Sequence, residues 1–294
     1  MTIPLSLAWL AAGAALTGLA IGSFLNVVAH RLPRMLERRW AQECAAFATP
    51  ADTPPDADST RASTDAPFNL AMPRSHCPHC GHTLAWHENI PLLSWLWQRG
   101  RCSACRAPIG WHYPVVEALT ALWFVACVLH WPDARAAVLW AGFGAALITL
   151  SLIDWQTTYL PDEINQPLLW CGLMGAALAW SGTRLPDALW GAVAGYLSLW
   201  VVCRGFEWIT GRIGMGEGDF KLLAAIGAWA GWQALLPVVL LASVAGVVAG
   251  LLMKSRGALR EGGYLPFGPF LALAGMLVSV GMFDESMRWL GLLP

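Results

Sequence analysis

The sequence predicts an all-α polytopic membrane protein, and three observations support this fold class. Apolar residues make up 56% of the chain. Charged residues make up only 13%, which is about half their share in ordinary soluble proteins. Several apolar runs exceed the roughly 18 residues that a bilayer-spanning helix needs. The net charge of −1 gives no support for a nucleic-acid partner, and we expect none.

The first expected membrane helix runs from Leu5 to Val28, within residues 1–29. No Lys or Arg precedes this apolar run, which is also longer than the core of a signal peptide. A stop-transfer cluster follows it, consisting of Arg31, Arg34, Arg38 and Arg39. We therefore expect a retained transmembrane helix rather than a cleaved signal peptide.

A cytoplasmic loop is expected over residues 30–113, with two parts. Residues 41–69 are predicted to be a disordered linker, because most of them lie in a stretch rich in Ala, Pro, Asp, Ser and Thr. Residues 74–112 carry four clustered cysteines and several tryptophans, so they are predicted to form a small folded module.

Seven further spans would bring the total to about eight, and residues 114–294 would form a seven-helix membrane domain. We place these spans at residues 114–129, 135–153, 164–181, 186–206, 219–233, 234–253 and 266–283. Only a tight turn around Gly231 to Pro237 separates the sixth span from the seventh. A broken or re-entrant hairpin is therefore an open alternative at this point.

The distribution of Lys and Arg predicts the orientation in the bilayer. If the first long loop is cytoplasmic, most of the 18 Lys and Arg residues lie inside, and only Arg135, Arg184 and Arg288 lie outside. Lys and Arg concentrate in the cytoplasmic loops of membrane proteins. We therefore expect both termini outside the cytoplasm and the module of residues 74–112 inside it.

Two aspartates are candidates for paired-carboxylate chemistry on the cytoplasmic side. Asp219 follows a glycine-rich stretch and begins an apolar helix, where it could simply cap the helix. Asp154 ends a long apolar run, where the helix dipole disfavours a negative charge. Carboxylates at a membrane edge are usually functional. Two carboxylates a few ångströms apart do not both ionise easily, so one can activate a water while the other polarises a carbonyl.

The residues expected to support this pair are Gly216, Gly218, Asp162 and Lys221. The two glycines would let the loop bring one aspartate to the other. Asp162 follows Pro161 directly and is interpreted as the N-cap of a helix. The alternating glycines also resemble a phosphate-binding loop, but that motif needs a preceding strand, and here an apolar helix precedes it.

Two Cys-x-x-Cys pairs form a second group of candidate residues, Cys77 with Cys80 and Cys102 with Cys105. Paired thiolates at this spacing favour a tetrahedral zinc ion. A cytoplasmic location disfavours disulfides. We expect one structural zinc, although a nearby histidine could replace one of the cysteines.

The chain resembles the bacterial type IV prepilin leader peptidases, which are membrane aspartic peptidases of the GxGD type and also N-methyltransferases. The motifs that carry the resemblance extend over nearly the whole chain. They are Gly22–Val28 with His30–Pro33, the Cys-x-x-Cys pairs flanking Glu88–Trp95, Tyr113–Pro114 with Glu117, Ile153–Asp154 with Leu160–Asp162, Gly216–Asp219, and Pro266–Pro269.

This resemblance implies that Asp154 and Asp219 are the catalytic pair. They would cut after a glycine in the basic leader of a prepilin or pseudopilin, at the cytoplasmic face of the bacterial inner membrane, for type IV pili or type II secretion. It also implies methylation of the new N-terminal residue, usually Phe, by S-adenosylmethionine. Gly100 is tied to that activity, although it could equally serve only to shape a zinc knuckle. The expected partners are prepilins, pseudopilins and membrane lipid.

Two functions from other classes stay open on the sequence. An ion-coupled transporter could bind a cation with paired aspartates, but it does not need a zinc module, and the sequence shows no inverted repeat of broken helices. A non-enzymatic pilus or secretion assembly scaffold could use the module to dock partners. Shortening of a prepilin incubated with membranes that contain the protein would distinguish a peptidase from both.

Overall fold

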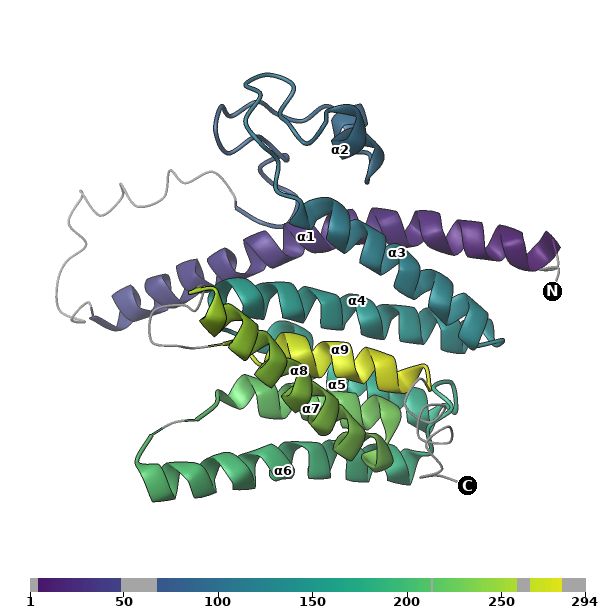
Figure 1. Cartoon of the computed structure of the whole chain (residues 1–294), viewed down its shortest axis with the longest axis vertical. Helices are drawn as coiled ribbons and strands as arrows, with labels where there is room; N and C mark the ends of the chain where they lie inside the picture. Colours follow the sequence, from purple (N-terminus) through teal and green to yellow (C-terminus); the bar gives the residue numbers. More distant parts are fainter. Residues whose placement is uncertain (1–4, 49–67, 213, 258–264, 282–294) are drawn as a thin grey trace. The chain divides into compact units, whose positions relative to one another are not determined.

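The computed structural model describes residues 5–48, 68–212, 214–257 and 265–281, and the named elements in these ranges are all helices, as predicted (Figure 1). The α-helices are α1 (Leu5–Ala48), α2 (Leu93–Trp97), α3 (His112–His130), α4 (Ala134–Thr157), α5 (Asp162–Ala177), α6 (Leu185–Thr210), α7 (Glu217–Ala230), α8 (Leu235–Ser255) and α9 (Gly268–Ser279). Two short 3-10 helices are η2 (Trp86–Asn89) and η3 (Trp232–Ala234).

The chain forms two compact units. Unit 1 consists of residues 1–18 and 120–294, and unit 2 consists of residues 19–119. Helices α1 and α3 each contribute to both units. Unit 1 contains the two candidate aspartates, and unit 2 contains the four clustered cysteines.

A helix lies at each of the eight predicted spans. Within the described residues, five segments are long and apolar enough to cross a bilayer: α1, α3, α4, α6 and η3 together with α8. Helices α5, α7 and α9 have 16, 14 and 12 residues. At a rise of 1.5 Å per residue, α7 is about 21 Å long, against a hydrocarbon core of about 30 Å. The end of the eighth predicted span lies outside the described residues.

Helix α1 differs most from its prediction, because it continues to Ala48 rather than ending near Val28. The sequence beyond Val28 is rich in Arg, Glu, Gln, Leu and Ala, which all favour a helix, so the helix extends from apolar into polar sequence. Residues 41–48 are therefore helical rather than part of a disordered linker. The rest of that predicted linker, residues 49–67, lies outside the described residues.

Helix α7 is the buried centre of unit 1. It packs against α5, α6 and α9, and Leu222, Leu223 and Ile226 on it are completely buried. Glycines let α6 come very close to α7, because a Cβ on Gly191 would collide with the carbonyl of Gly227. Small residues serve the same purpose at many helix contacts in membranes. This packing fixes the position of the helix that carries Asp219.

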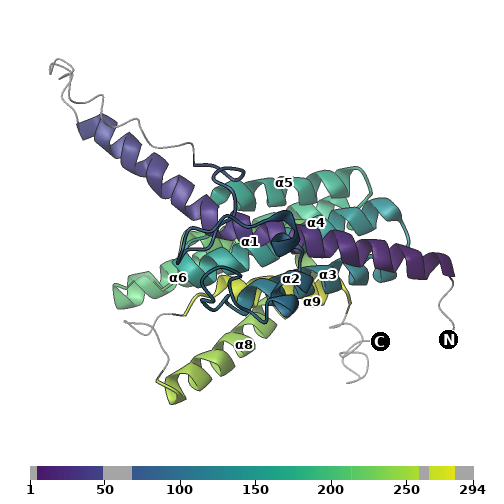
Figure 2. The same cartoon turned by 90° about the horizontal axis from the view of Figure 1, so that it is seen from above.

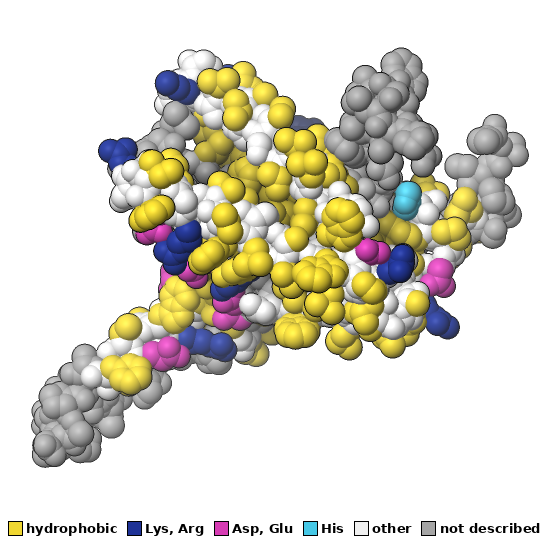
Figure 3. Space-filling model, turned by 90° about the horizontal axis from the view of Figure 1, so that it is seen from below, with side chains coloured by type: hydrophobic (Ala, Val, Ile, Leu, Met, Phe, Trp, Pro, Cys, Tyr) yellow, Lys and Arg dark blue, Asp and Glu magenta, His cyan; other side chains and the backbone are white. Residues whose placement is uncertain are grey.

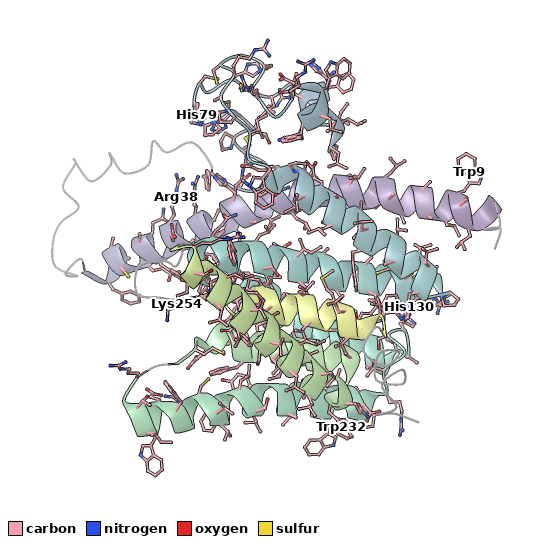
Figure 4. All side chains as sticks on the ribbon, in the orientation of Figure 1. Trp9, Arg38, His79, His130, Trp232 and Lys254 are labelled. Atoms are coloured by element: carbon pink, nitrogen blue, oxygen red, sulfur yellow. The ribbon has the colours of Figure 1, made fainter. Side chains whose placement is uncertain are left out.

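The outer surface of unit 1 is largely apolar. Helix α8 runs obliquely to its neighbours and is mostly exposed along its apolar length (Figure 2). Hydrophobic side chains also predominate over the face in Figure 3. Trp9, His130 and Trp232 lie toward one end of the helices of this unit, while Lys254 lies at the other end of α8 (Figure 4). Apolar sides with aromatic and basic residues near the ends are typical of a protein embedded in a bilayer.

Unit 2 ties its cysteine-containing loops to α1 and α3 through two buried charged side chains. Arg31 on α1 donates hydrogen bonds to three backbone carbonyls at the start of the loops, those of Asn69, Leu70 and Pro73. Glu117 on α3 accepts a hydrogen bond of 2.7 Å from the backbone N–H of Leu92. All of these residues belong to unit 2. The hydrogen bonds therefore attach the cysteine-containing loops to α1 and α3 within this unit.

Candidate active site and cysteine cluster

Four helix ends meet in unit 1 around the two predicted aspartates. They are the C-terminal end of α4 and the N-terminal ends of α5, α7 and α9. Direct contacts join them: α9 to α4, with Gly268 N–H bonded to Asp154, and α5 to α7, with Asp162 bonded to Lys221. The predicted meeting of Asp154 and Asp219 at one end of the helices is therefore seen in the structure, because the side chains also interact electrostatically.

Asp154 lies in the last turn of α4 and is only 5% exposed. Its backbone carbonyl accepts a 2.8 Å hydrogen bond from Thr158, whose left-handed backbone ends the helix. Its carboxylate oxygen Oδ2 accepts a 3.0 Å hydrogen bond from the backbone N–H of Gly268. A Cβ at position 268 would lie 2.6 Å from the same oxygen, so the close approach of the backbone requires glycine.

Asp219 does not cap its helix. The N-cap residue of α7 is Gly216, no side chain caps this helix, and Asp219 occupies its first turn. The side chain is buried, and its oxygen Oδ1 has no hydrogen-bond partner among the described residues. A buried polar atom without a partner is rare and points to a missing water, ion or substrate group. This oxygen is therefore available to a water, an ion or a group of a ligand.

The two supporting glycines have different surroundings. A Cβ on Gly218 would lie 2.8 Å from the Cβ of Leu160, so Gly218 permits close packing. Gly216 has open space around its Cβ position. Asp219 lies within the first turn of α7, and the role of the two glycines in bringing it to Asp154 stays a prediction. The sequence alone could not show that Gly218 packs against Leu160, because the two residues lie in different segments of the chain.

The predicted capping role of Asp162 is wrong. Helix α5 begins at Asp162, its N-cap residue is Pro161, and no side chain caps it. Both carboxylate oxygens of Asp162 instead accept hydrogen bonds from Lys221 Nζ, at 2.8 and 2.7 Å. This ion pair joins the first turn of α5 to α7. Lys221 lies two residues after Asp219 in the sequence, so the ion pair is close to the two aspartates.

The four predicted cysteines come together in unit 2. Their Sγ atoms all lie within 4.8 Å of one another, with 3.8 Å between Cys77 and Cys105 and 4.0 Å between Cys80 and Cys102. A tetrahedral zinc ion with bonds of about 2.3 Å places its sulfur ligands roughly 3.8 Å apart. Thus the cluster suits zinc. Among the described residues, the group of possible metal ligands consists of these four cysteines and includes no histidine.

Backbone hydrogen bonds favour the thiolate form of two of the four cysteines, Cys77 and Cys102, whereas the pKa of Cys105 is raised to about 11. The backbone N–H groups of Cys80 and His79 lower the pKa of the Cys77 thiol to about 7, which favours the thiolate that binds metal. Glu88 joins the two knuckles, because it is hydrogen-bonded to Ser103 of the second and to the N–H of Ala85 beside the first. These bonds lower the pKa of Glu88 to about 2.

Gly100 has a clear packing role. Its φ of +67° is a left-handed conformation that favours glycine, and a Cβ there would lie 2.9 Å from the Trp95 ring. The indole N–H of Trp95 in turn donates to the carbonyl of Ile109 at 3.3 Å. The structure therefore supports the interpretation that Gly100 shapes the second knuckle.

Two residues of the site were missed by sequence reasoning. Gly268 was noted only as part of a motif, although its N–H contacts Asp154. Asn165 is 1% exposed, and its side-chain amide donates to the carbonyl of Gly218 at 3.5 Å. The Pro-Phe-Gly-Pro stretch before an apolar helix was a usable signal for the first. No local pattern distinguishes Asn165 from a polar residue on a helix surface.

Comparisons with known proteins agree with this arrangement. The family model described as "Bacterial Peptidase A24 N-terminal domain" matches residues 16–131, and the one described as "Type IV leader peptidase family" matches residues 141–251. No solved structure gave a match.

Curated relatives match along most of their length. A prepilin leader peptidase/N-methyltransferase of Aeromonas hydrophila is 47% identical over 93% of this chain and 91% of its own. One from Burkholderia pseudomallei strain 1026b is 48% identical over 88% of this chain and 81% of its own. One from Pseudomonas aeruginosa is 46% identical over 89% of this chain and 87% of its own. With both matched domains in order and the paired aspartates in place, the chain belongs to the type IV leader peptidase family.

Proposed function

We propose that the protein is a bifunctional enzyme of the bacterial inner membrane. As an aspartic endopeptidase, it removes the basic leader of type IV prepilins and pseudopilins after a glycine. As an N-methyltransferase, it then methylates the new N-terminal residue. The observation that carries the proposal is the pair of buried, interacting carboxylates of Asp154 and Asp219, one of which has an oxygen without a partner. The relatives bear the name of this enzyme, which favours it over a transporter or an assembly scaffold.

The contacts of the pair suggest different roles for its members. Gly268 N–H donates to Asp154, so this oxygen is an acceptor, and we assign Asp154 the part of the base. Oδ1 of Asp219 is available to a substrate carbonyl, so we assign Asp219 the part of the acid. Asp154 takes a proton from a water whose oxygen bonds to the scissile carbonyl carbon, while Asp219 donates to the carbonyl oxygen. The C–N bond then breaks, and the amine leaves with a proton from the pair.

The distribution of Lys and Arg supports placing the helix ends with the aspartates, and the cysteine module, on the cytoplasmic side. Both termini would then be periplasmic. A basic leader would meet the exposed carboxylates of Glu163 and Glu217, near the starts of α5 and α7. Asp162 is less available to it, because Lys221 already pairs with this carboxylate.

The cofactors of the proposal are zinc and S-adenosylmethionine. Cys77, Cys80, Cys102 and Cys105 would hold one structural zinc, for which their spacing is suited. S-adenosylmethionine supplies an electrophilic methyl group to the unprotonated amine. The hollow beside Gly100 is lined by Arg99, Arg101 and Arg106 and does not suit this donor, because its sulfonium gives it a net positive charge. We therefore propose that methylation requires the fold of the module, and we place no donor in that hollow.

The first prediction concerns the peptidase. Asp154→Asn and Asp219→Asn should each lower the rate of prepilin cleavage by about 100-fold or more, because each removes one proton-transfer role. Membranes with each variant would be incubated with a prepilin, and the shortened product measured by mass spectrometry. Asp162→Asn is the control, since losing a part-exposed ion pair has a small effect. Substantial cleavage by either of the first two variants, at normal abundance, would remove that residue from the pair.

The second prediction concerns the metal. The purified protein should contain one zinc per chain, and the double variant Cys80→Ser with Cys102→Ser should contain almost none. Its module should also become sensitive to protease, because a structural zinc supplies folding free energy that so small a segment lacks. Cys44→Ser is the control, since Cys44 is exposed and lies outside the cluster. Metal analysis that finds full zinc content in the double variant contradicts the assignment.

The third prediction separates methylation from cleavage. Gly100→Ser should give a pilin that is cleaved but unmethylated, because the new side chain meets Trp95 in the module while the aspartates lie in the other unit. Gly81→Ser is a matched control. Gly81 also has a positive φ, +72°, but nothing lies near its Cβ position, so methylation should persist. The mass of the pilin N-terminus measures both activities. Equal loss of cleavage and methylation in zinc-containing Gly100→Ser protein contradicts the separation.

A further inference from the structure

Unit 2 contains a hollow of about 640 Å³ with an unbalanced positive charge. It is lined by Trp97, Gln98, Arg99, Arg101 and Arg106. The three arginines are exposed, and in the described part of unit 2 none forms an ion pair with a carboxylate. The sole carboxylate side chain of residues 68–111 is Glu88, which is already bonded to Ser103, Ala85 and His82.

The cysteine cluster offsets only part of this charge imbalance. A zinc ion with four thiolates would have a formal charge of −2 against the three guanidinium groups, and its sulfur atoms also accept hydrogen bonds from the backbone of their own knuckles. Cys77 accepts them from Cys80 and His79, and Cys102 accepts them from Cys105 and Ala104. The guanidinium groups line the hollow instead. An anionic ligand would therefore complement the hollow directly.

Two of these arginines, Arg99 with a φ of +52° and Arg106, occupy positions at which glycine would be less strained. Gly81 follows the first Cys-x-x-Cys pair with a φ of +72°, and Arg106 follows the second pair with a φ of +60°. The two positions are equivalent in the two knuckles. Glycine adopts this left-handed conformation freely, whereas a residue with a Cβ is strained in it. The second knuckle thus tolerates strain in order to present a guanidinium group.

The short helix α2 turns an apolar face outward beside the hollow. Leu93, Leu96 and Trp97 lie on one face of the helix at i, i+3 and i+4, and their side chains are 63%, 62% and 89% exposed. Trp95 on the opposite face packs against Gly100. Trp97 belongs both to the apolar face and to the hollow, so the two surfaces are continuous.

The positive charge of the arginines disfavours binding of the prepilin leader and of S-adenosylmethionine in this hollow. Both the basic leader of a prepilin and the sulfonium of the methyl donor are positively charged. An anionic phospholipid matches both parts of the surface, because arginines bind phosphate and exposed Trp and Leu side chains enter the headgroup boundary. The chain also keeps the surface near a bilayer. Arg106 precedes the start of α3, a candidate membrane span, by six residues, which reach about 20 Å when extended.

We propose that the hollow of Arg99, Arg101 and Arg106 binds the phosphate-bearing headgroup of an anionic phospholipid, while Leu93, Leu96 and Trp97 of α2 insert into the membrane interface. This inference does not depend on the assignment of either enzymatic activity. It concerns how the cysteine module is held against the membrane.

Photo-crosslinking in the full-length protein tests the site. Trp97 is replaced by the photoreactive residue benzoylphenylalanine, and the protein is placed in nanodiscs of phosphatidylcholine alone or of phosphatidylcholine with phosphatidylglycerol. Irradiation should attach phosphatidylglycerol to the peptide that contains position 97. In this background, Arg99→Gln with Arg106→Gln should reduce the phosphatidylglycerol adduct about tenfold. The control, Arg39→Gln with Arg74→Gln, removes the same charge from exposed arginines outside the hollow and should retain the adduct.

Three results would overturn the proposal: no lipid adduct, equal adducts in the two double variants, or capture of an added prepilin in place of lipid. Hydrogen exchange supplies a second measurement that needs no substitution. In the wild-type protein, residues 93–106 should exchange severalfold more slowly in nanodiscs with phosphatidylglycerol than in phosphatidylcholine alone. Equal exchange rates in the two kinds of nanodisc would also overturn it.

Discussion

The burial of two interacting carboxylates, Asp154 and Asp219, at one end of the helices is the constraint on which the packing of unit 1 depends. Two like charges repel each other, and burial makes each ionised carboxylate more costly. A flexible protein would separate such groups or expose them to water. The packing around them prevents both, since α7 is held between α5, α6 and α9 and Gly268 N–H holds Asp154 from α9. Rigid packing thus keeps the two groups close and buried, which favours the state in which only one of them is ionised.

Both ends of α7 make specific contacts, of which the buried one at the C-terminal end holds the helix more firmly than the part-exposed ion pair at the N-terminal end. At the N-terminal end, Lys221 bonds to Asp162 on α5. At the other end, Trp229 is buried, donates a 2.8 Å hydrogen bond to the carbonyl of Leu168, and packs against Trp140 and Phe143 of α4. Between them, the glycine contact with α6 leaves no space for a side chain. A short helix fixed in this way can present an aspartate without the freedom of a loop.

Much of this arrangement could be predicted from the residues. Long apolar runs locate the helices, and an aspartate at the end of such a run marks a site because it is costly there. The cysteine spacing indicates four ligands for one metal, and the four sulfur atoms indeed lie together. The positions of the helices and the clustering of the cysteines are confirmed, because each depends on local composition or on a short repeat.

The parts that were missed depend on contacts between distant segments. Asp162 was interpreted as a cap because a carboxylate after proline commonly starts a helix, but its partner Lys221 lies on another helix. Gly218 permits contact with Leu160, and Gly268 permits contact with Asp154. In each case, the reason for the residue type is a contact with a residue that is distant in the sequence. The length of α1 was missed because a membrane helix can extend into polar sequence with good helix formers.

The start of α9 holds the side chain of Asp154, the proposed base, through Gly268 N–H, and the cleavage rate of Gly268→Ala protein tests most directly whether prepilin cleavage depends on this contact. The added methyl group would lie 2.6 Å from Oδ2 of Asp154, so the account predicts a fall in prepilin cleavage of about tenfold or more in protein that is still inserted and contains zinc. Gly246→Ala is the control, because its nearest neighbours, Phe270 and Phe267, lie at ordinary contact distances of 3.7 and 3.8 Å, and it should cleave normally. Cleavage by Gly268→Ala at the wild-type rate would contradict the account.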